Sequence, residues 1–232
     1  MPRQVLVTGA TRGIGEALVK HYLAAGDFVI GCGRGESAIV HERYSHYCAD
    51  VAQEADVNAI FSSLRERIPA LDVLINNAGI ASMNTIALTP TDTARRILET
   101  NCLGTFQFSR AALRFLRHSS AGRIVNLTSV AVPFRLSGEA MYAASKSAVE
   151  TFTRIAAHEF APFGITCNAV GPSPIKTRLT ESVPRAAMKG LLDRQAISAW
   201  ATTDDVVNVI DFFLRPESQM VTGQVIYLGG AS

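Results

Sequence analysis

The stretch VLVTGATRGIG, residues 5–15, joins a short apolar run to a loop with three glycines. Gly9, Gly13 and Gly15 have no side chain to obstruct a ligand that approaches the backbone. The residues after the loop have the apolar spacing of a helix, whose first N–H groups are unpaired and attract an anion. A strand, a glycine loop and a helix in this order predict a site for the pyrophosphate of a dinucleotide. The alternative interpretation is a simple glycine-rich turn.

Short apolar runs alternate with amphipathic stretches along the rest of the chain. Besides residues 4–8, we expect strands at residues 27–32, 45–49, 71–76, 122–129, 165–170 and 224–228. We expect helices at residues 13–25, 53–67, 91–116, 139–160 and 203–214. This alternation is typical of a parallel sheet covered on both faces. We therefore predict one doubly wound α/β domain, a Rossmann fold, over residues 1–232, with ligands beyond the carboxyl ends of the strands.

The composition limits the possible partners. The 232 residues include 22 basic and 20 acidic side chains, a balance that predicts no strong attraction to nucleic acid or to a membrane surface. The first apolar run is too short for a signal peptide or a membrane span. The four cysteines have no metal-ligand spacing, so we expect no metal site, buried free thiols and a cytoplasmic protein. These cysteines are Cys32, Cys48, Cys102 and Cys167.

The end of the second expected strand discriminates between the two nicotinamide dinucleotides. Residues 29–34 read VIGCGR and contain no acid that could bind a ribose 2′-hydroxyl. Arg34 can donate two charge-assisted hydrogen bonds to a 2′-phosphate, and Arg12 in the glycine loop adds a second cation. We therefore predict NADP(H), although Glu36 lies close by and both arginines could simply be solvated.

A second group of polar residues follows the strand expected at residues 122–129. Ser129 ends that strand, and Tyr142 and Lys146 are four positions apart, on one face of the next helix. An ammonium group near a phenol favours the phenolate, so we expect the pKa of Tyr142 to be lowered. Such a tyrosine can transfer protons, and the Ser129 hydroxyl can hydrogen-bond a substrate oxygen as negative charge develops on it. On spacing alone, a solvated Tyr–Lys helix face is the alternative.

Over residues 5–230 the sequence resembles the short-chain dehydrogenase/reductase family, and most of all its 3-oxoacyl-acyl-carrier-protein reductases. The resemblance is carried by the G-x-x-x-G-x-G loop, the Ser–Tyr–Lys set, the NNAG sequence at residues 76–79 and the TGQ sequence at residues 222–224. It implies reduction of a ketone or 3-oxoacyl group by hydride transfer. Tyr142 would act as general acid, Ser129 would polarise the carbonyl, and Lys146 would hold the nicotinamide ribose. Asn101 would hold, on its backbone, a water of a proton relay.

The resemblance also implies a set of cofactor-binding positions along the carboxyl edge of the sheet. They are Thr8, Gly9, Thr11, Arg12, Gly13, Ile14, Gly15, Arg34, Asp50, Val51, Asn77, Ala78, Gly79, Tyr142, Lys146, Pro172, Ile175 and Thr177.

The sequence departs from the family pattern at two places. Ser173 stands where relatives have a glycine, whose backbone conformation a serine could disfavour. The segment at residues 34–50 is short, so we expect one or two helical turns or irregular chain there. An amphipathic helical lid is expected at about residues 178–200, and its apolar side chains favour a hydrophobic small molecule or an acyl thioester as substrate.

Several alternatives stay open. Residues 158–164 contain no arginine or lysine, so recognition of an acyl carrier protein is undecided. An NAD-linked alcohol or hydroxysteroid-type dehydrogenase, a non-catalytic dinucleotide-binding regulator and a sugar epimerase are competing functions, and the glycine spacing opposes the last. The resemblance further implies a homodimer or homotetramer, assembled through the helices at residues 91–116 and 139–160.

Overall fold

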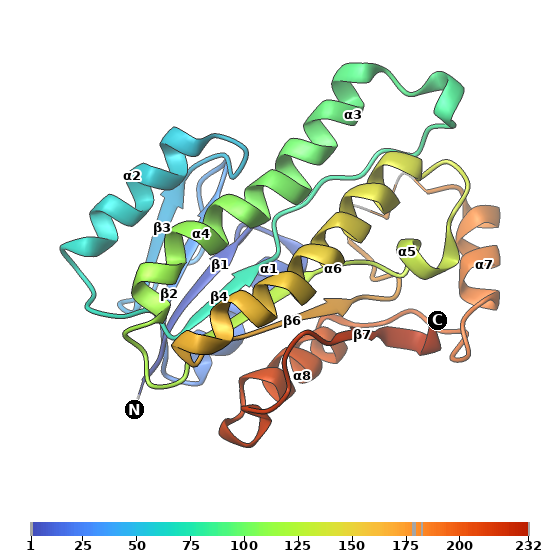
Figure 1. Cartoon of the computed structure of the whole chain (residues 1–232). Coiled ribbons are helices and arrows are strands. Elements are labelled where there is room, and N and C mark those ends of the chain that lie inside the picture. The colour runs from blue at the N-terminus through green and yellow to red at the C-terminus, as the bar shows by residue number, and fades with distance from the viewer. Residues whose placement is uncertain (1, 178–179, 182, 232) are drawn as a thin grey trace.

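A seven-stranded parallel sheet forms the centre of the computed structural model, which describes residues 2–177, 180–181 and 183–231. The strand order is β3-β2-β1-β4-β5-β6-β7, so the chain winds outward from β1 in both directions (Figure 1). This confirms the predicted doubly wound α/β fold. The strands are β1 (Gln4–Thr8), β2 (Phe28–Gly33), β3 (Tyr44–Cys48), β4 (Val73–Asn76), β5 (Arg123–Leu127), β6 (Thr166–Gly171) and β7 (Val225–Tyr227).

Helices cover both faces of the sheet. One face carries α1 (Gly13–Ala24) and α8 (Thr203–Leu214). The other carries α2 (Glu54–Arg65), α4 (Gly104–Leu116) and α6 (Ala140–Phe160). The remaining helices of at least four residues are α3 (Thr91–Leu98), the π-helical η2 (Glu99–Leu103), α5 (Ala131–Phe134) and α7 (Arg185–Asp193). Among the helices described, none has both the length and the apolar character that a membrane span requires.

The central strand, β1, shows why the apolar runs in the sequence do not alternate with polar residues. Leu6 packs into the core under α2, α4 and α6, whereas Val5 and Val7 pack into the core under α1 and α8. Successive side chains of a strand point to opposite faces, and here both faces are covered. All three side chains are fully buried, and each such burial contributes about 1.5–3 kcal/mol.

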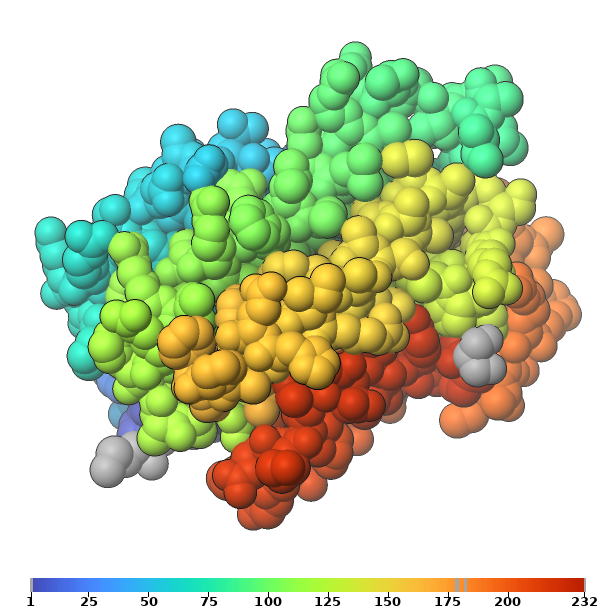
Figure 2. Space-filling view, viewed as in Figure 1, coloured from blue at the N-terminus to red at the C-terminus, as the bar shows by residue number. Residues whose placement is uncertain are grey.

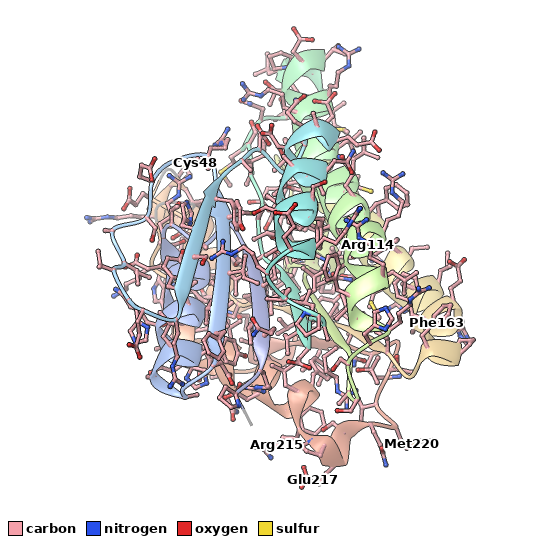
Figure 3. The ribbon with its side chains drawn as sticks, turned by 90° about the vertical axis from the view of Figure 1, so that its left-hand side faces the viewer. Cys48, Arg114, Phe163, Arg215, Glu217 and Met220 are labelled. Atoms are coloured by element: carbon pink, nitrogen blue, oxygen red, sulfur yellow. The ribbon has the colours of Figure 1, made fainter. Side chains whose placement is uncertain are left out.

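Parallel strands bring their carboxyl ends to one edge of the sheet. Figure 3 shows Cys48, the last residue of β3, near that edge, with Arg215 and Glu217 beyond the end of α8 at the opposite side of the molecule. Cys48 is exposed because β3 is an edge strand, and Cys102 is half-buried, so the expectation that all four thiols are buried is wrong for these two and holds for Cys32 and Cys167.

The structure departs from the expected helix pattern at two points and decides between two expected forms at another. The helix expected at residues 91–116 is interrupted by η2, whose turn is wider than that of an α-helix. The chain from Gly35 to Val40 contains no helix, so the short connection between β2 and β3 has the irregular one of the two expected forms. The four-residue α5 was not expected, and it ends at Arg135 in the left-handed conformation, with φ 48°.

Candidate active site

The glycine loop is hydrogen-bonded to the NNAG sequence at residues 76–79, the asparagine motif, at the end of β4. Asn77 donates from Nδ2 to the carbonyl oxygen of Thr8 at 2.8 Å, and the Thr8 hydroxyl accepts from the backbone N–H groups of Asn77 and Ala78, both at 3.0 Å. Gly9 has φ 67°, which favours glycine, and a Cβ on Gly15 would lie 2.1 Å from the Gly9 carbonyl oxygen. The loop and the first turn of α1 therefore pack backbone against backbone.

This loop fits the pyrophosphate of a dinucleotide. Arg12 is the N-cap residue of α1, and no side chain hydrogen-bonds to the first N–H groups of the helix there. Unpaired N–H groups at a helix N-terminus bind anions. The Thr177 methyl lies 3.5 Å from the Cβ position of Gly13, which brings the loop after β6, with its expected cofactor-binding residues, to the same place.

A pocket of about 510 Å³ opens beyond the ends of β2 and β3. Arg34 and Asp50 line one part of it, and Ile80, Arg96 and Thr100 line another. The side chain of Asp50 accepts a hydrogen bond from the N–H of Ala52 at 3.0 Å, which fixes that carboxylate. A pocket of this volume with a few convergent polar groups suits a small ligand such as the adenosine part of a dinucleotide. Neighbouring Val51 is buried against Gly104.

The three side chains expected to carry the chemistry lie together. Ser129 follows β5, and its hydroxyl is close enough to Tyr142 to hydrogen-bond the phenol. Lys146 lies one turn after Tyr142 in α6, with its Nζ 6.0 Å from the centroid of the phenol ring. The same Nζ donates to the carbonyl oxygen of Leu127 at 2.7 Å, so the lysine is held against the end of β5.

The expected lowering of the Tyr142 pKa is wrong for this structure. Burial raises the pKa of Tyr142 to about 12, because it disfavours the phenolate more than the hydrogen bond from Ser129 favours it. The negative charge of Glu139 raises it further. Burial also lowers the pKa of Lys146 to about 8.

Asn101 is fully buried in η2 and hydrogen-bonds through its side chain. Its Oδ1 accepts from the N–H of Ile80 at 2.8 Å, and its Nδ2 donates to the Ile80 carbonyl at 2.9 Å and to the Ser145 hydroxyl at 2.9 Å. Ser145 in turn donates to the carbonyl of Tyr142 at 2.7 Å. Sequence reasoning missed Ser145, although it stands directly before Lys146. A Cβ on Gly79 would lie 3.3 Å from Lys146 Nζ, so these residues share one site.

The loop after β6 accommodates the serine that replaces a glycine. Among the described non-glycine residues only Arg135 has a positive φ, so Ser173 adopts a conformation open to any residue. Its buried hydroxyl donates to the side-chain oxygen of Gln195. Further along this loop, Ile175 forms a parallel bridge with Ala201. The expected lid contains α7, an amphipathic helix whose Met188 is buried, while residues 178, 179 and 182 lie outside the described residues.

Comparison with known proteins gives extensive matches. A family model described as enoyl-(acyl carrier protein) reductase matches residues 9–231. The 3-oxoacyl-acyl-carrier-protein reductase of Salmonella typhimurium is 30% identical, over 97% of this chain and 95% of its own length. The 2-(R)-hydroxypropyl-CoM dehydrogenase of Xanthobacter autotrophicus is 32% identical, over 100% of this chain and 98% of its own.

Two solved structures have the same fold over nearly the whole of this chain. The ligand-free aldohexose dehydrogenase of Thermoplasma acidophilum has a TM-score of 0.89 at 27% identity and covers 99% of this chain and 93% of its own. A 4-hydroxyisoleucine dehydrogenase complexed with NADH has a TM-score of 0.89 at 25% identity and covers 99% of this chain and 98% of its own.

Proposed function

The chain belongs to the short-chain dehydrogenase/reductase family and is an oxidoreductase, and we propose that it reduces a ketone or 3-oxoacyl group with NADPH. The observation that carries this proposal is the meeting of Ser129, Tyr142 and Lys146 at the carboxyl edge of the sheet, beside a helix N-terminus that no side chain caps. A bound NADPH supplies the hydride.

The protein's own residues bind the substrate oxygen and supply its proton. Ser129 hydrogen-bonds the carbonyl oxygen and stabilises the negative charge that develops on it. Tyr142 donates the proton, and its raised pKa keeps the phenol protonated at neutral pH, as a reduction requires. Lys146, with a pKa of about 8, is largely protonated at pH 7 and can hydrogen-bond the nicotinamide ribose. Asn101 fixes the chain around Ile80 and supports the relay that returns a proton to this site.

NADPH is the proposed cofactor because of the residues at the end of β2. Arg34 is exposed in the pocket beyond that strand, and Arg12 is exposed at the start of α1. The remaining cofactor contacts come from Thr8, Gly9, Thr11, Gly13, Ile14, Gly15, Asp50, Val51, Asn77, Ala78, Gly79, Pro172, Ile175 and Thr177.

The test is a fluorescence titration of the protein with NADPH and with NADH, repeated on Arg34→Asp. Loss of two charge-assisted hydrogen bonds to a 2′-phosphate, and gain of a like charge, should weaken NADPH binding about 100-fold. Binding of NADH should change little or improve. Arg117→Asp, an exposed position beyond the end of α4 and at the other edge of the sheet, is the matched control.

Equal or tighter binding of NADH by the wild type would remove the argument from Arg34. An NAD-linked dehydrogenase is then the second candidate, favoured by the exposed Glu36 beside Arg34 and by the relative whose structure contains NADH. Oxidation of NADPH by a ketone or by a 3-oxoacyl thioester is the direct measurement of the reductase activity.

The proposed substrate is an apolar ketone or an acyl thioester. The buried Met188 and half-buried Leu191 and Leu192 of α7 support an apolar group, and the Salmonella relative acts on a 3-oxoacyl group on acyl carrier protein. We also propose a homodimer or homotetramer, because α3, η2, α4 and α6 carry exposed apolar side chains that a second copy could cover.

A further inference from the structure

Arg194, the residue directly after α7, contacts α5 in two ways. Its Nη2 donates to the carbonyl oxygen of Phe134 at 2.7 Å, and its guanidinium lies over the Phe134 ring, 4.8 Å from the centroid. A charge-assisted hydrogen bond and a cation–π contact from one guanidinium reinforce each other. These contacts fasten α7 to α5, which Figure 1 shows beside it.

The way in which α5 ends makes the Phe134 carbonyl available. The helix has four residues, and Arg135 then turns in the left-handed conformation with its N–H directed back to the carbonyl of Ala131 at 3.1 Å. The last carbonyl groups of a helix have no donor within the helix. Arg194 supplies the donor for the carbonyl of Phe134, and it does so from a segment 60 residues away in the sequence.

Apolar packing joins the same two helices. Phe134 is 7% exposed and belongs to a small cluster with Val130 and Ala231, against which Leu191 of α7 packs. Leu191 and Arg194 are three positions apart and lie on one face of a helix. Arg194 therefore contacts Phe134 itself, and Leu191 brings α7 against the cluster that contains it.

The opposite end of α5 contacts the candidate active site. The N–H of Ala131, the first residue of α5, donates to the Ser129 hydroxyl oxygen at 3.1 Å. Four helical residues span about 6 Å, so a shift of α5 at Phe134 moves this N–H as well. The orientation of the Ser129 hydroxyl thus depends on where α5 lies.

We propose that Arg194 is a positioning residue that couples the docking of α7 to the orientation of the Ser129 hydroxyl. This inference rests on the proposed function, in which Ser129 polarises the substrate carbonyl. Arg194 acts through α5: when α7 docks over the substrate, the guanidinium fixes Phe134, and α5 then holds Ser129 in the position that the reduction needs.

The first measurement is hydrogen–deuterium exchange of the full chain, which needs no substrate. Arg194→Met keeps most of the side-chain length and removes the donor, whereas Arg194→Lys keeps the charge. Lys189→Met is the matched control, because Lys189 is on the same helix, exposed, and pairs with Asp193. We expect Arg194→Met to accelerate exchange in both α7 and α5, Arg194→Lys to do so less, and the control to leave α5 unchanged.

The second measurement is kinetic, with a ketone or 3-oxoacyl thioester and NADPH. Misplacing Ser129 should lower kcat about tenfold and raise KM for the carbonyl substrate, since a displacement below 1 Å at a catalytic group has effects of this size. NADPH affinity should stay within about twofold, because the residues proposed to hold it lie elsewhere. Arg194→Lys should recover part of the lost kcat.

Two results would overturn the proposal. Faster exchange confined to α7 means that Arg194 only secures the end of its own helix. An unchanged kcat in Arg194→Met, with α5 exchange accelerated, means that α5 does not control Ser129. If the wild type turns over no carbonyl compound, the proposed function fails, while the exchange measurement still decides whether α7 and α5 are coupled.

Discussion

Tyr142 and Lys146 lie on one face of α6, with only 8% and 4% of their surfaces exposed. At such depth the cost of removing a charge from water is larger than the benefit of a neighbouring partner. Burial consequently disfavours both the phenolate and the ammonium, and moves the two pKa values in opposite directions. The site holds a lysine that lowers the stability of the folded chain at neutral pH.

Lys146→Met should therefore raise the melting temperature at pH 7 while abolishing reduction. The folded pKa is lowered from 10.5 to about 8, so the unfolded chain binds more protons between these pH values and wild-type stability rises with pH across them. Below pH 8 the variant should be more stable by about 3 kcal/mol, and above pH 10.5 that advantage should disappear.

Thermal melts from pH 6 to pH 11 measure this difference. Lys189→Met, on an exposed lysine of α7, should show no such pH dependence. A Lys146→Met protein that is less stable than wild type at pH 7 would show that the hydrogen bond to Leu127 outweighs the cost of burying the charge.

The residues of this site could be placed from the sequence, but their electrostatics could not. The spacing of Ser129, Tyr142 and Lys146 follows from local geometry: one strand end and one helix face. The direction of the Tyr142 pKa shift depends on how deeply the fold buries the phenol. The spacing of residues in the sequence does not give this depth. Ser145 was missed for the same reason, because its hydroxyl accepts a hydrogen bond from Asn101, 44 residues away in the sequence.

At the scale of the element, η2 carries a hydrogen-bonding side chain of the site on a widened helical turn. Asn101 makes two hydrogen bonds with the backbone of Ile80, and the turn that carries it contains one residue more than an α-helical turn. Such π-helical turns occur often at functional sites. An α-helix would place residues 98 and 103 about 140° apart, and the wider turn reduces that angle. The sequence ETNCL of this turn, residues 99–103, contains no proline or glycine that signals it.

The junction of the glycine loop and α1 gives a prediction at the same scale. In Gly15→Ala, the new Cβ would lie 2.1 Å from the Gly9 carbonyl oxygen and 2.6 Å from Asn77 Nδ2, so the loop must move. Its N–H groups would leave the pyrophosphate site, and NADPH affinity should fall at least about 100-fold, as expected when several hydrogen bonds to charged groups are lost. Titration with NADPH measures the effect.

Gly190→Ala is the matched control, since it introduces the same methyl group into α7 with nothing within 4 Å of it. It should leave NADPH affinity unchanged and raise the stability of the helix by about 0.5–1 kcal/mol. Wild-type NADPH affinity in Gly15→Ala would mean that the loop can relax without losing its phosphate contacts.

For the whole molecule, the order of strands explains why distant motifs form one site. The glycine loop, the asparagine motif and Ser129 follow β1, β4 and β5, which are neighbours in the sheet. Because the alternation of apolar strands and amphipathic helices is local in sequence, it predicted this arrangement. The docking of α7 on α5 could not be predicted in this way, because it depends on one arginine that meets one carbonyl 60 residues away.

The face formed by α3, η2, α4 and α6 has an exposed apolar patch, with Leu98, Leu103, Phe106 and Ile155 between 37% and 52% exposed. Figure 2 shows these helices side by side on one surface.

If a second copy covers these helices about a twofold axis, Phe106→Glu places a carboxylate in an apolar contact on both copies, where its desolvation is costly. Light scattering should then show monomers where the wild type is a dimer or tetramer, with unchanged circular dichroism. Val40→Glu, at a 97% exposed loop position, should keep the wild-type mass. A Phe106→Glu protein of wild-type mass would place the interface elsewhere, and a monomeric wild type would disprove the oligomer.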